Sequence, residues 1–279
     1  MTAERPVART GRGGPVFIMA PCQRSGTNWL AHILTDCGPF TMADPARLPG
    51  EDWLLEHAGH LIRYCTRTVG EWRNKWQPWT QDAARSAEAA LALAEELGRG
   101  ILRHVAGPNE QARLLFHTPS VRNIVLGGHL FPDAQIVAIV RDGRDVVDSA
   151  TSSWPSTTAE AWAKRWAAGV AELVRAVAAD TGGRILMLKY EDLYENPRQA
   201  LDRVESHLRL CPGSIDLQKV SQLPVFGSSR LDGGGDWSWS VERRSSGFRP
   251  IGKWKTWPQE KLRAVEAIAG GELRALGYA

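Results

Sequence analysis

The chain has 279 residues, of which 43% are hydrophobic, and this is enough to bury a large core in one α/β domain. Its net charge of +3 is too small to indicate a nucleic-acid-binding or membrane-binding protein. None of the four cysteines stands in a C-x-x-C pair, so we expect neither a zinc site nor a disulfide framework, and a reduced cytoplasm fits best.

The first fourteen residues carry three arginines among Gly, Pro and Thr, and only a short apolar run follows them. That run falls far below the roughly 18 apolar residues that a membrane span requires, and it is also too short for a signal-peptide core. We therefore expect a disordered tail over residues 1–14, a single domain over residues 15–279, and a soluble cytoplasmic protein.

The apolar run that begins at Val16 predicts a buried strand, followed by a polar turn and a helix. Backbone N–H groups at such a helix start bind anions, and the helix dipole adds to their attraction. A nucleoside-triphosphate loop of the form G-x-x-x-x-G-K-S/T needs a lysine at the position of Gly26. The chain therefore lacks the lysine of that motif. The turn consists of Arg24, Ser25, Gly26, Thr27 and Asn28.

Residues 36–80 are rich in Trp, Pro and Gly, and we expect irregular structure there. Ala and Leu at helical spacing predict a helix over about residues 81–105. A strand over residues 113–117 and a short helix over residues 121–127 are expected next.

A second apolar strand begins at Gln135 and leads through a charged turn into a helix. Arg141 and Ser149 in this segment suit a phosphate, because a guanidinium offers a planar fork and a hydroxyl adds a neutral donor. Arg144 is expected to belong to a solvated ion-pair cluster at the helix start.

Thr158 is a predicted N-cap for a long helix that runs through Ala179. A strand over residues 184–190 and a helix over residues 197–210 follow. Residues 227–249 are a Gly/Ser-rich loop, which we interpret as a lid that orders when ligand binds.

The alternation of strands and helices predicts an α/β fold with a parallel sheet and helices on both faces, a three-layer arrangement. Ligands of such sheets bind beyond the carboxyl ends of the strands, where both polar turns fall.

Four segments, in order over residues 15–258, together resemble the sulfotransferases that use 3′-phosphoadenosine-5′-phosphosulfate (PAPS) as donor. Arg-Ser-Gly-Thr-x-Trp-Leu resembles their 5′-phosphosulfate loop, and the segment from Arg141 to Ser149 resembles their 3′-phosphate motif R-D/N-x-R/K-D-x-x-x-S. The segment Tyr-Glu-Asp-Leu, which begins at Tyr190, is similar to a strand end of the family. The resemblance implies that Tyr190 lies near the adenine of the donor. Near the C-terminus the match to G-D-W-K is looser, because Lys253 replaces the acidic residue.

The resemblance implies a P-loop-like sulfotransferase architecture that takes PAPS and releases 3′-phosphoadenosine 5′-phosphate (PAP). The short Ser-Gly-Thr loop and Thr118-Pro119 look more like the broad carbohydrate and tyrosylprotein branch. The donor-binding residues that the resemblance implies are Arg24, Ser25, Gly26, Thr27, Asn28, Trp29, Arg141, Ser149, Tyr190, Arg249, Gly252 and Lys253.

Arg24 is the leading catalytic candidate, because its charge would stabilise the bridging oxygen as the phosphate departs. No metal is expected. In the register of the family's motif, His117 stands where the family often has a lysine. Pro119 stands where cytosolic members have the histidine that acts as general base, so that usual base is missing here. His117 is therefore a candidate for the base or for a contact to the sulfuryl group. Because the tyrosylprotein-like branch uses a carboxylate after the first helix, the alternatives are Asp44, Glu51 and Asp52.

Twelve tryptophans are many for this length. Helical spacing predicts a core role for Trp72, Trp76 and Trp79, and for Trp162 and Trp166. Tryptophans in irregular segments are candidates for an acceptor pocket, namely Trp53, Trp237 and Trp239.

Two other classes of function remain open from the sequence. A P-loop nucleotide kinase would share the first strand, turn and helix, and a non-catalytic module would bind PAP without transfer. We expect the acceptor to be a hydroxyl or amine of a small molecule, carbohydrate or natural product. The sequence identifies neither the individual acceptor nor the oligomeric state.

Overall fold

The computed structural model describes residues 13–48, 51–76, 83–107, 113–223, 230–231, 237–238 and 249–278. The expected disordered tail lies almost wholly outside these residues. So does most of the expected lid, apart from two short strands and Arg249. Trp79 and Trp239 are also outside the described part of the chain.

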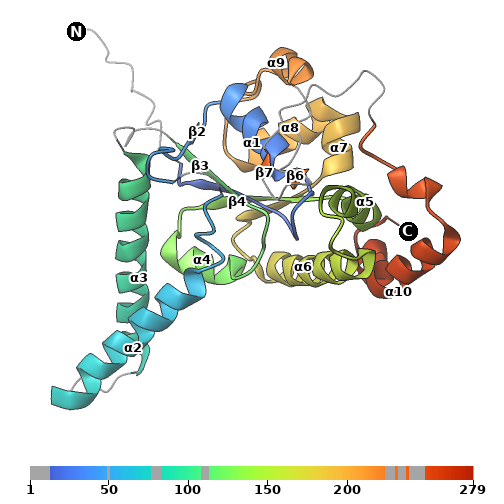
Figure 1. Cartoon of the computed structure of the whole chain (residues 1–279). Coiled ribbons are helices and arrows are strands. Elements are labelled where there is room, and N and C mark those ends of the chain that lie inside the picture. Colours follow the sequence, from blue (N-terminus) through green and yellow to red (C-terminus); the bar gives the residue numbers. More distant parts are fainter. Residues whose placement is uncertain are drawn as a thin grey trace, which may run out of the picture.

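Five parallel strands form the central sheet in the order β2-β3-β1-β4-β5 (Figure 1). The strands are β1 (Val16–Met19), β2 (Thr41–Met42), β3 (Leu114–Thr118), β4 (Gln135–Val140) and β5 (Ile185–Lys189). Because all five are parallel, their carboxyl ends meet at one edge, and β1 brings its own following turn to the middle of that edge. A separate antiparallel pair is made by β6 (Arg230–Leu231) and β7 (Trp237–Ser238).

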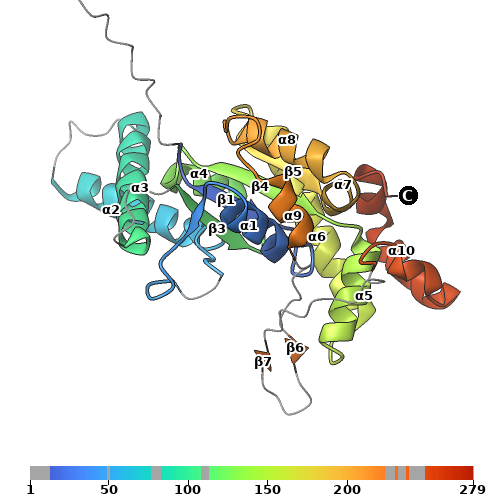
Figure 2. The ribbon, with the colours of Figure 1, turned by 90° about the horizontal axis from the view of Figure 1, so that it is seen from above.

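Helices cover both faces of the sheet, as predicted. In Figures 1 and 2, α1, α7 and α8 lie on one face, and α4 and α6 lie on the other. The helices are α1 (Thr27–Asp36), α2 (Ala58–Trp76), α3 (Ala83–Ala106), α4 (Ile124–Leu130), α5 (Gly143–Ser153), α6 (Ala159–Ala179), α7 (Tyr190–Glu195), α8 (Pro197–His207), α9 (Leu217–Gln222) and α10 (Gln259–Ala275), with a 3-10 turn, η2 (Lys253–Thr256).

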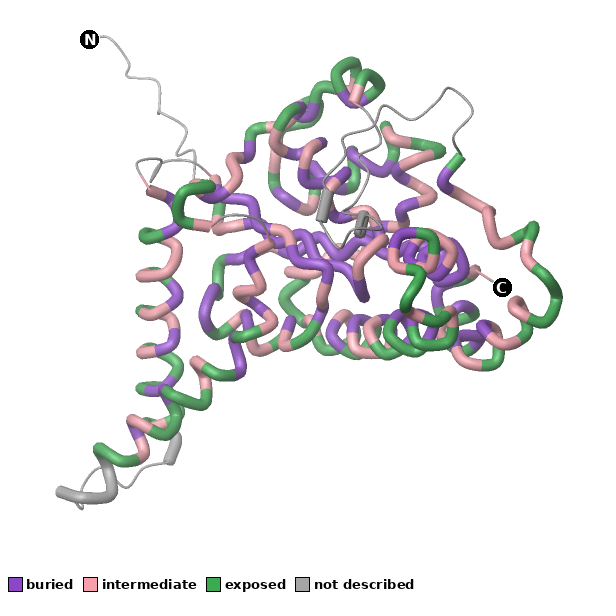
Figure 3. The backbone as a smooth tube through the Cα atoms, viewed as in Figure 1, coloured by how far each residue is buried: buried purple, intermediate pink, exposed green. Residues whose placement is uncertain are grey.

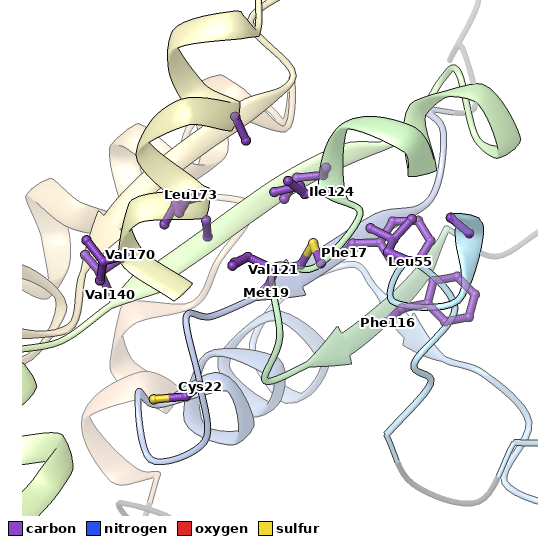
Figure 4. Close-up of a cluster of buried hydrophobic side chains, with 14 of the residues drawn as sticks. Phe17, Met19, Cys22, Leu55, Phe116, Val121, Ile124, Val140, Val170 and Leu173 are labelled. Carbon is purple, nitrogen blue, oxygen red and sulfur yellow. The ribbon is translucent and has the colours of Figure 1, made fainter. Parts of the chain in front are cut away.

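Side chains that alternate along each strand fill two hydrophobic cores, one on each face. Ile18 and its neighbours pack under α1, whereas Phe17 and Phe116 face α4 and α6 with ring centroids 4.9 Å apart. Figure 4 shows Phe17, Met19 and Phe116 in the core on the face that α4 and α6 cover. Figure 3 shows how continuously the central strands are buried, which explains why they read as unbroken apolar runs.

The expectation of irregular structure over residues 36–80 is wrong, because α2 and β2 lie within it. Cys65 and Val69 recur one helical turn apart and are both buried, so this spacing was the signal for α2. The helix packs along α3, and the two extend away from the sheet as a hairpin (Figure 1). Trp72 is 65% exposed and is therefore not a core residue, in contrast to the prediction.

Other elements agree with the sequence or are shifted by a few residues. The side chain of Thr158 accepts a hydrogen bond from the N–H of Ala161, so the predicted cap of α6 is confirmed. Trp162 and Trp166 are core residues, as predicted. Helix α4 starts three residues later than Val121, and Tyr190 begins α7 rather than ending a strand. No described helix combines the length and the apolar character of a membrane span.

Candidate functional site

The turn after β1 is shaped by two residues in the left-handed region. Arg24 has φ 73° and Gly26 has φ 103°. The buried hydroxyl of Ser25 donates to the carbonyl of Cys22 at 2.9 Å, which closes the turn from inside. Gly26 is the N-cap of α1 and has no side chain, so it does not cap the first N–H groups of α1. Thr27 and Asn28 follow without an acidic residue, and this arrangement suits an anion.

Gly26 is required by a close approach as well as by its φ. A Cβ at this position would lie 2.5 Å from Cδ2 of Tyr190. Tyr190 in turn packs against Trp29, with ring centroids 5.3 Å apart, and both rings are buried. Tyr190, the predicted adenine neighbour, and Trp29, a predicted donor-binding residue, therefore pack on each other behind the turn.

Arg141 connects this turn to two other segments. Its Nη1 donates to the carbonyl of Arg24 at 2.9 Å, and its Nη2 donates to the carbonyl of Pro250. The guanidinium lies 4.7 Å from the ring centroid of Tyr190. Its Nε is buried and has no hydrogen-bond partner within the part of the chain that the structure describes. A buried donor of this kind is costly unless an acceptor is supplied, and a phosphate oxygen would supply one.

Ser149 lies on α5 and meets the first turn directly. Its hydroxyl accepts a hydrogen bond from Nε of Arg24 at 3.0 Å. The guanidinium of Arg24 also lies 5.3 Å from the ring of Trp154, a contact that the sequence did not indicate. Arg24, Arg141 and Ser149 are thus brought together at the carboxyl edge of the sheet.

Arg144 forms the predicted ion pair with Asp142, but this pair is buried rather than solvated. Its Nη2 lies 2.8 Å from Oδ2 of Asp142, and its Nη1 lies 3.2 Å from Glu266. The guanidinium stacks on the ring of Trp254 at 3.6 Å. These contacts make Arg144 a structural residue that joins α5 to η2 and α10, which together we call the C-terminal segment (residues 249–278).

Asp145 holds the C-terminal segment against α5, and sequence reasoning missed this role. Its fully buried carboxylate accepts hydrogen bonds from the N–H groups of Gly252 at 2.7 Å and Lys253 at 2.8 Å. Gly252 and Lys253 therefore lie against α5, the helix that carries Ser149. Arg249 does not join it in the same way, because its exposed guanidinium lies 3.5 Å from Glu195. An acidic residue in the first turn of a helix is too common to have singled out Asp145 in advance.

His117 lies near the carboxyl end of β3, and burial lowers its pKa to about 4, with a further contribution from the charge of His32. Its Nδ1 has no partner among the described residues. At neutral pH the imidazole is therefore uncharged.

The carboxylate candidates differ in their surroundings. Burial, together with the neighbouring charge of Asp52, raises the pKa of Glu51 to about 7. Burial also raises the pKa of Asp52, although the N–H of Leu54 donates to its Oδ1 at 2.9 Å. Asp44 accepts the N–H of Ala46 at 2.9 Å and lies 3.7 Å from Nε of Arg47, so it belongs to a local turn.

A cavity of about 480 Å³ adjoins the first turn on the α6 side of the sheet. Its wall includes residues 21–23, the segment 119–122, Trp53 and one face of α6. Four charged side chains line it, namely Glu56, Arg122, Arg165 and Glu172. The sequence predicted three tryptophans as candidates for an acceptor pocket. Among them, Trp53 is the one whose side chain lies in the described part of the structure, and it lines this cavity. No described group of three His, Cys, Asp or Glu side chains has the arrangement of a metal site.

The family model described as the sulfotransferase family matches residues 15–211 of this sequence. Among solved structures, the sulfotransferase domain from the curacin biosynthetic pathway superposes with a TM-score of 0.54 at 16% identity, covering 96% of this chain and 98% of that chain. The sulfotransferase domain from the Synechococcus PCC 7002 olefin synthase gives a TM-score of 0.51 at 18% identity, covering 92% and 95%. Mouse sulfotransferase SULT7A1, complexed with PAP, gives 0.50 at 14% identity, covering 94% and 84%. No curated protein sequence matches significantly.

Proposed function

The chain belongs to the sulfotransferase family, and we propose that it moves a sulfuryl group from PAPS to a hydroxyl or amine of a small-molecule, carbohydrate or natural-product acceptor, releasing PAP. We also take residues 15–279 as one domain, a reading supported by a core that joins Phe17 to Leu276.

The observation that carries the proposal is the direct linkage of the two phosphate motifs. Arg24 of the first motif donates to Ser149 of the second at 3.0 Å, and Arg141 of the second donates to the Arg24 carbonyl at 2.9 Å. Two guanidinium groups and the start of α1 therefore face one small region. This concentration of donors suits a ligand that carries phosphates at two positions.

The residues present fit such a donor. Arg141 offers a buried Nε that has no partner among the residues the structure describes, and this supports its assignment, with Ser149, to the 3′-phosphate. Ser25, Gly26, Thr27 and Asn28 would hold the 5′-phosphosulfate through the N–H groups of the turn, with Arg24 beside them. PAP bound to mouse SULT7A1, which has the same fold, is consistent with this arrangement.

Bound PAPS would supply an activated sulfuryl group, so the protein's task is alignment and charge stabilisation. We assign Arg24 the role of stabilising the negative charge that grows on the leaving phosphate. Glu51 is assigned as the general base. It lies two residues before Trp53, which lines the cavity and donates its N–H to Oγ1 of Thr118 at 3.1 Å, and its pKa of about 7 matches neutral pH. His117 remains the alternative, although a pKa of about 4 makes its imidazole a weak proton acceptor.

Calorimetry with PAP and AMP tests the donor assignment. Wild-type protein should bind PAP more tightly than AMP. Arg141→Ala and the milder Ser149→Ala should weaken PAP binding, by roughly 10- to 100-fold for the lost charged contact, while hardly changing AMP binding. Arg175→Ala, on the exposed side of α6, is the matched control.

Two results would count against the donor assignment. Equal losses for PAP and AMP in both variants would make Arg141 and Ser149 structural. A wild-type protein that does not distinguish PAP from AMP would remove PAPS as the donor.

A further inference from the structure

The cavity beside the first turn, which we name the α6 cavity, has walls that differ in charge from one end to the other. It is lined by Gln23, Trp53, Glu56, Arg122, Arg165 and Glu172, among others. We propose that the α6 cavity binds the acceptor and selects acceptors that carry a basic nitrogen at the end remote from the reacting hydroxyl. This inference rests on the proposed function.

The position of the α6 cavity places it next to the reacting groups. Residues 21–23 line it and run directly into Arg24. On α6, Gly169 allows the helix to approach this segment, since a Cβ there would lie 2.3 Å from the carbonyl oxygen of Pro21. Ala168 and Gly169 are small, so this face of α6 leaves open space between Arg165 and Glu172.

The end of the cavity nearest the donor turn is positively charged. Nη1 of Arg165 donates to Oε1 of Gln23 at 3.3 Å, and Gln23 immediately precedes Arg24. Within the described ranges, Arg165 forms no ion pair with an acidic side chain. Its positive charge therefore faces the side where an anionic donor would lie.

The other end of the cavity carries two carboxylates. Glu172 lies seven residues beyond Arg165, about 10 Å along the helix, and its Oε1 accepts the N–H of Asn123 at 3.1 Å. Nδ2 of Asn123 donates to the carbonyl of Glu56, so both glutamates border the same residue. Arg122 lies 3.5 Å from Glu56, but its side chain is 69% exposed. Two carboxylates against one solvated guanidinium leave this end negative.

An acceptor with a cationic group at its remote end would meet the glutamates, whereas a carboxylate there would be repelled. Trp53 adds an aromatic ring to the wall, which favours a ring or a cation in the ligand. This tryptophan is held at φ 51°, with its N–H donating to Oγ1 of Thr118 at 3.1 Å. A strained, anchored aromatic residue in a cavity wall is typical of a binding site.

Three para-substituted phenols that differ in remote charge test this directly: tyramine, 4-ethylphenol and 3-(4-hydroxyphenyl)propionate. Each is titrated calorimetrically into the full chain saturated with PAP at low salt. Tyramine should bind about five- to tenfold more tightly than the neutral phenol, and the anionic phenol should bind most weakly. Glu172→Gln retains an oxygen acceptor for Asn123 and should reduce the tyramine preference to within about twofold. Glu88→Gln, on exposed α3, should leave the preference intact.

Equal binding of the three phenols, or an equal loss of preference in Glu88→Gln, would overturn the inference. So would the failure of all three to bind to protein that binds PAP normally. If PAP does not bind while tyramine still binds in a Glu172-dependent manner, the cavity assignment stands and the PAPS proposal fails.

Discussion

Nε of Arg24 donates a 3.0 Å hydrogen bond to the hydroxyl of Ser149, so the turn after β1 and the helix after β4 meet through two side chains. The two residues come from different motifs, and the parallel sheet brings them together because β1 and β4 are neighbouring strands. The contact brings the guanidinium of Arg24 to Ser149, which we assign with Arg141 to the 3′-phosphate.

Replacing Arg24 should affect turnover more than donor binding, because negative charge on the leaving phosphate grows in the transition state. We expect Arg24→Ala to reduce kcat by roughly 10²- to 10³-fold, the loss found when one transition-state donor is removed, with a smaller loss of PAP affinity. Steady-state kinetics and calorimetry on the same preparation separate the two quantities. Near-normal kcat would remove Arg24 from the catalytic role, and Arg175→Ala again serves as the control.

Asp145 is predicted to position the C-terminal segment. Asp145→Asn replaces one acceptor of the Gly252 and Lys253 N–H groups with an amide donor, so we expect a loss of about 1–3 kcal/mol in the free energy of unfolding. PAP affinity should fall as well, because Lys253 is no longer held near α5. Denaturant unfolding and PAP calorimetry measure the two effects. The exposed Asp202→Asn should change neither, and an unaltered PAP affinity in Asp145→Asn would rule out a positioning role.

The pH dependence of turnover distinguishes the two candidate bases. A base must be deprotonated, so activity falls as the pH drops below its pKa. With Glu51 as base, kcat/KM should fall roughly tenfold per pH unit below about pH 7. With His117 as base, the profile should stay flat until about pH 4. Glu51→Gln should remove the limb near pH 7 and lower the plateau, whereas survival of that limb would refute the assignment.

The sequence predicted the parts of the fold that rest on local patterns. The apolar runs of β1 and β4 and the cap at Thr158 are signals within a few residues. Helix α2 was missed because the Trp, Pro and Gly content of the region concealed the spacing of Cys65 and Val69.

The candidate site depends on contacts between residues far apart in the chain, and these could not be predicted. The motif spacing indicated Arg141 and Ser149, but not that Arg141 donates to Pro250 or that Asp145 holds Gly252. The pKa of His117 is another such property. Its unperturbed value suggested a base at neutral pH, whereas burial beside α1 lowers it, and burial is set by tertiary packing.

The central claim is transfer from PAPS, and its most direct test is incubation of the full chain with PAPS labelled in the sulfuryl sulfur and a mixed panel of phenol, sugar and amine acceptors. Mass spectrometry would follow the label, and chromatography would follow PAP. We expect a labelled sulfuryl group on at least one acceptor, an equal amount of PAP, and strongly reduced transfer by Arg24→Ala. Intact PAPS with every acceptor, or turnover of ATP in its place, would contradict it.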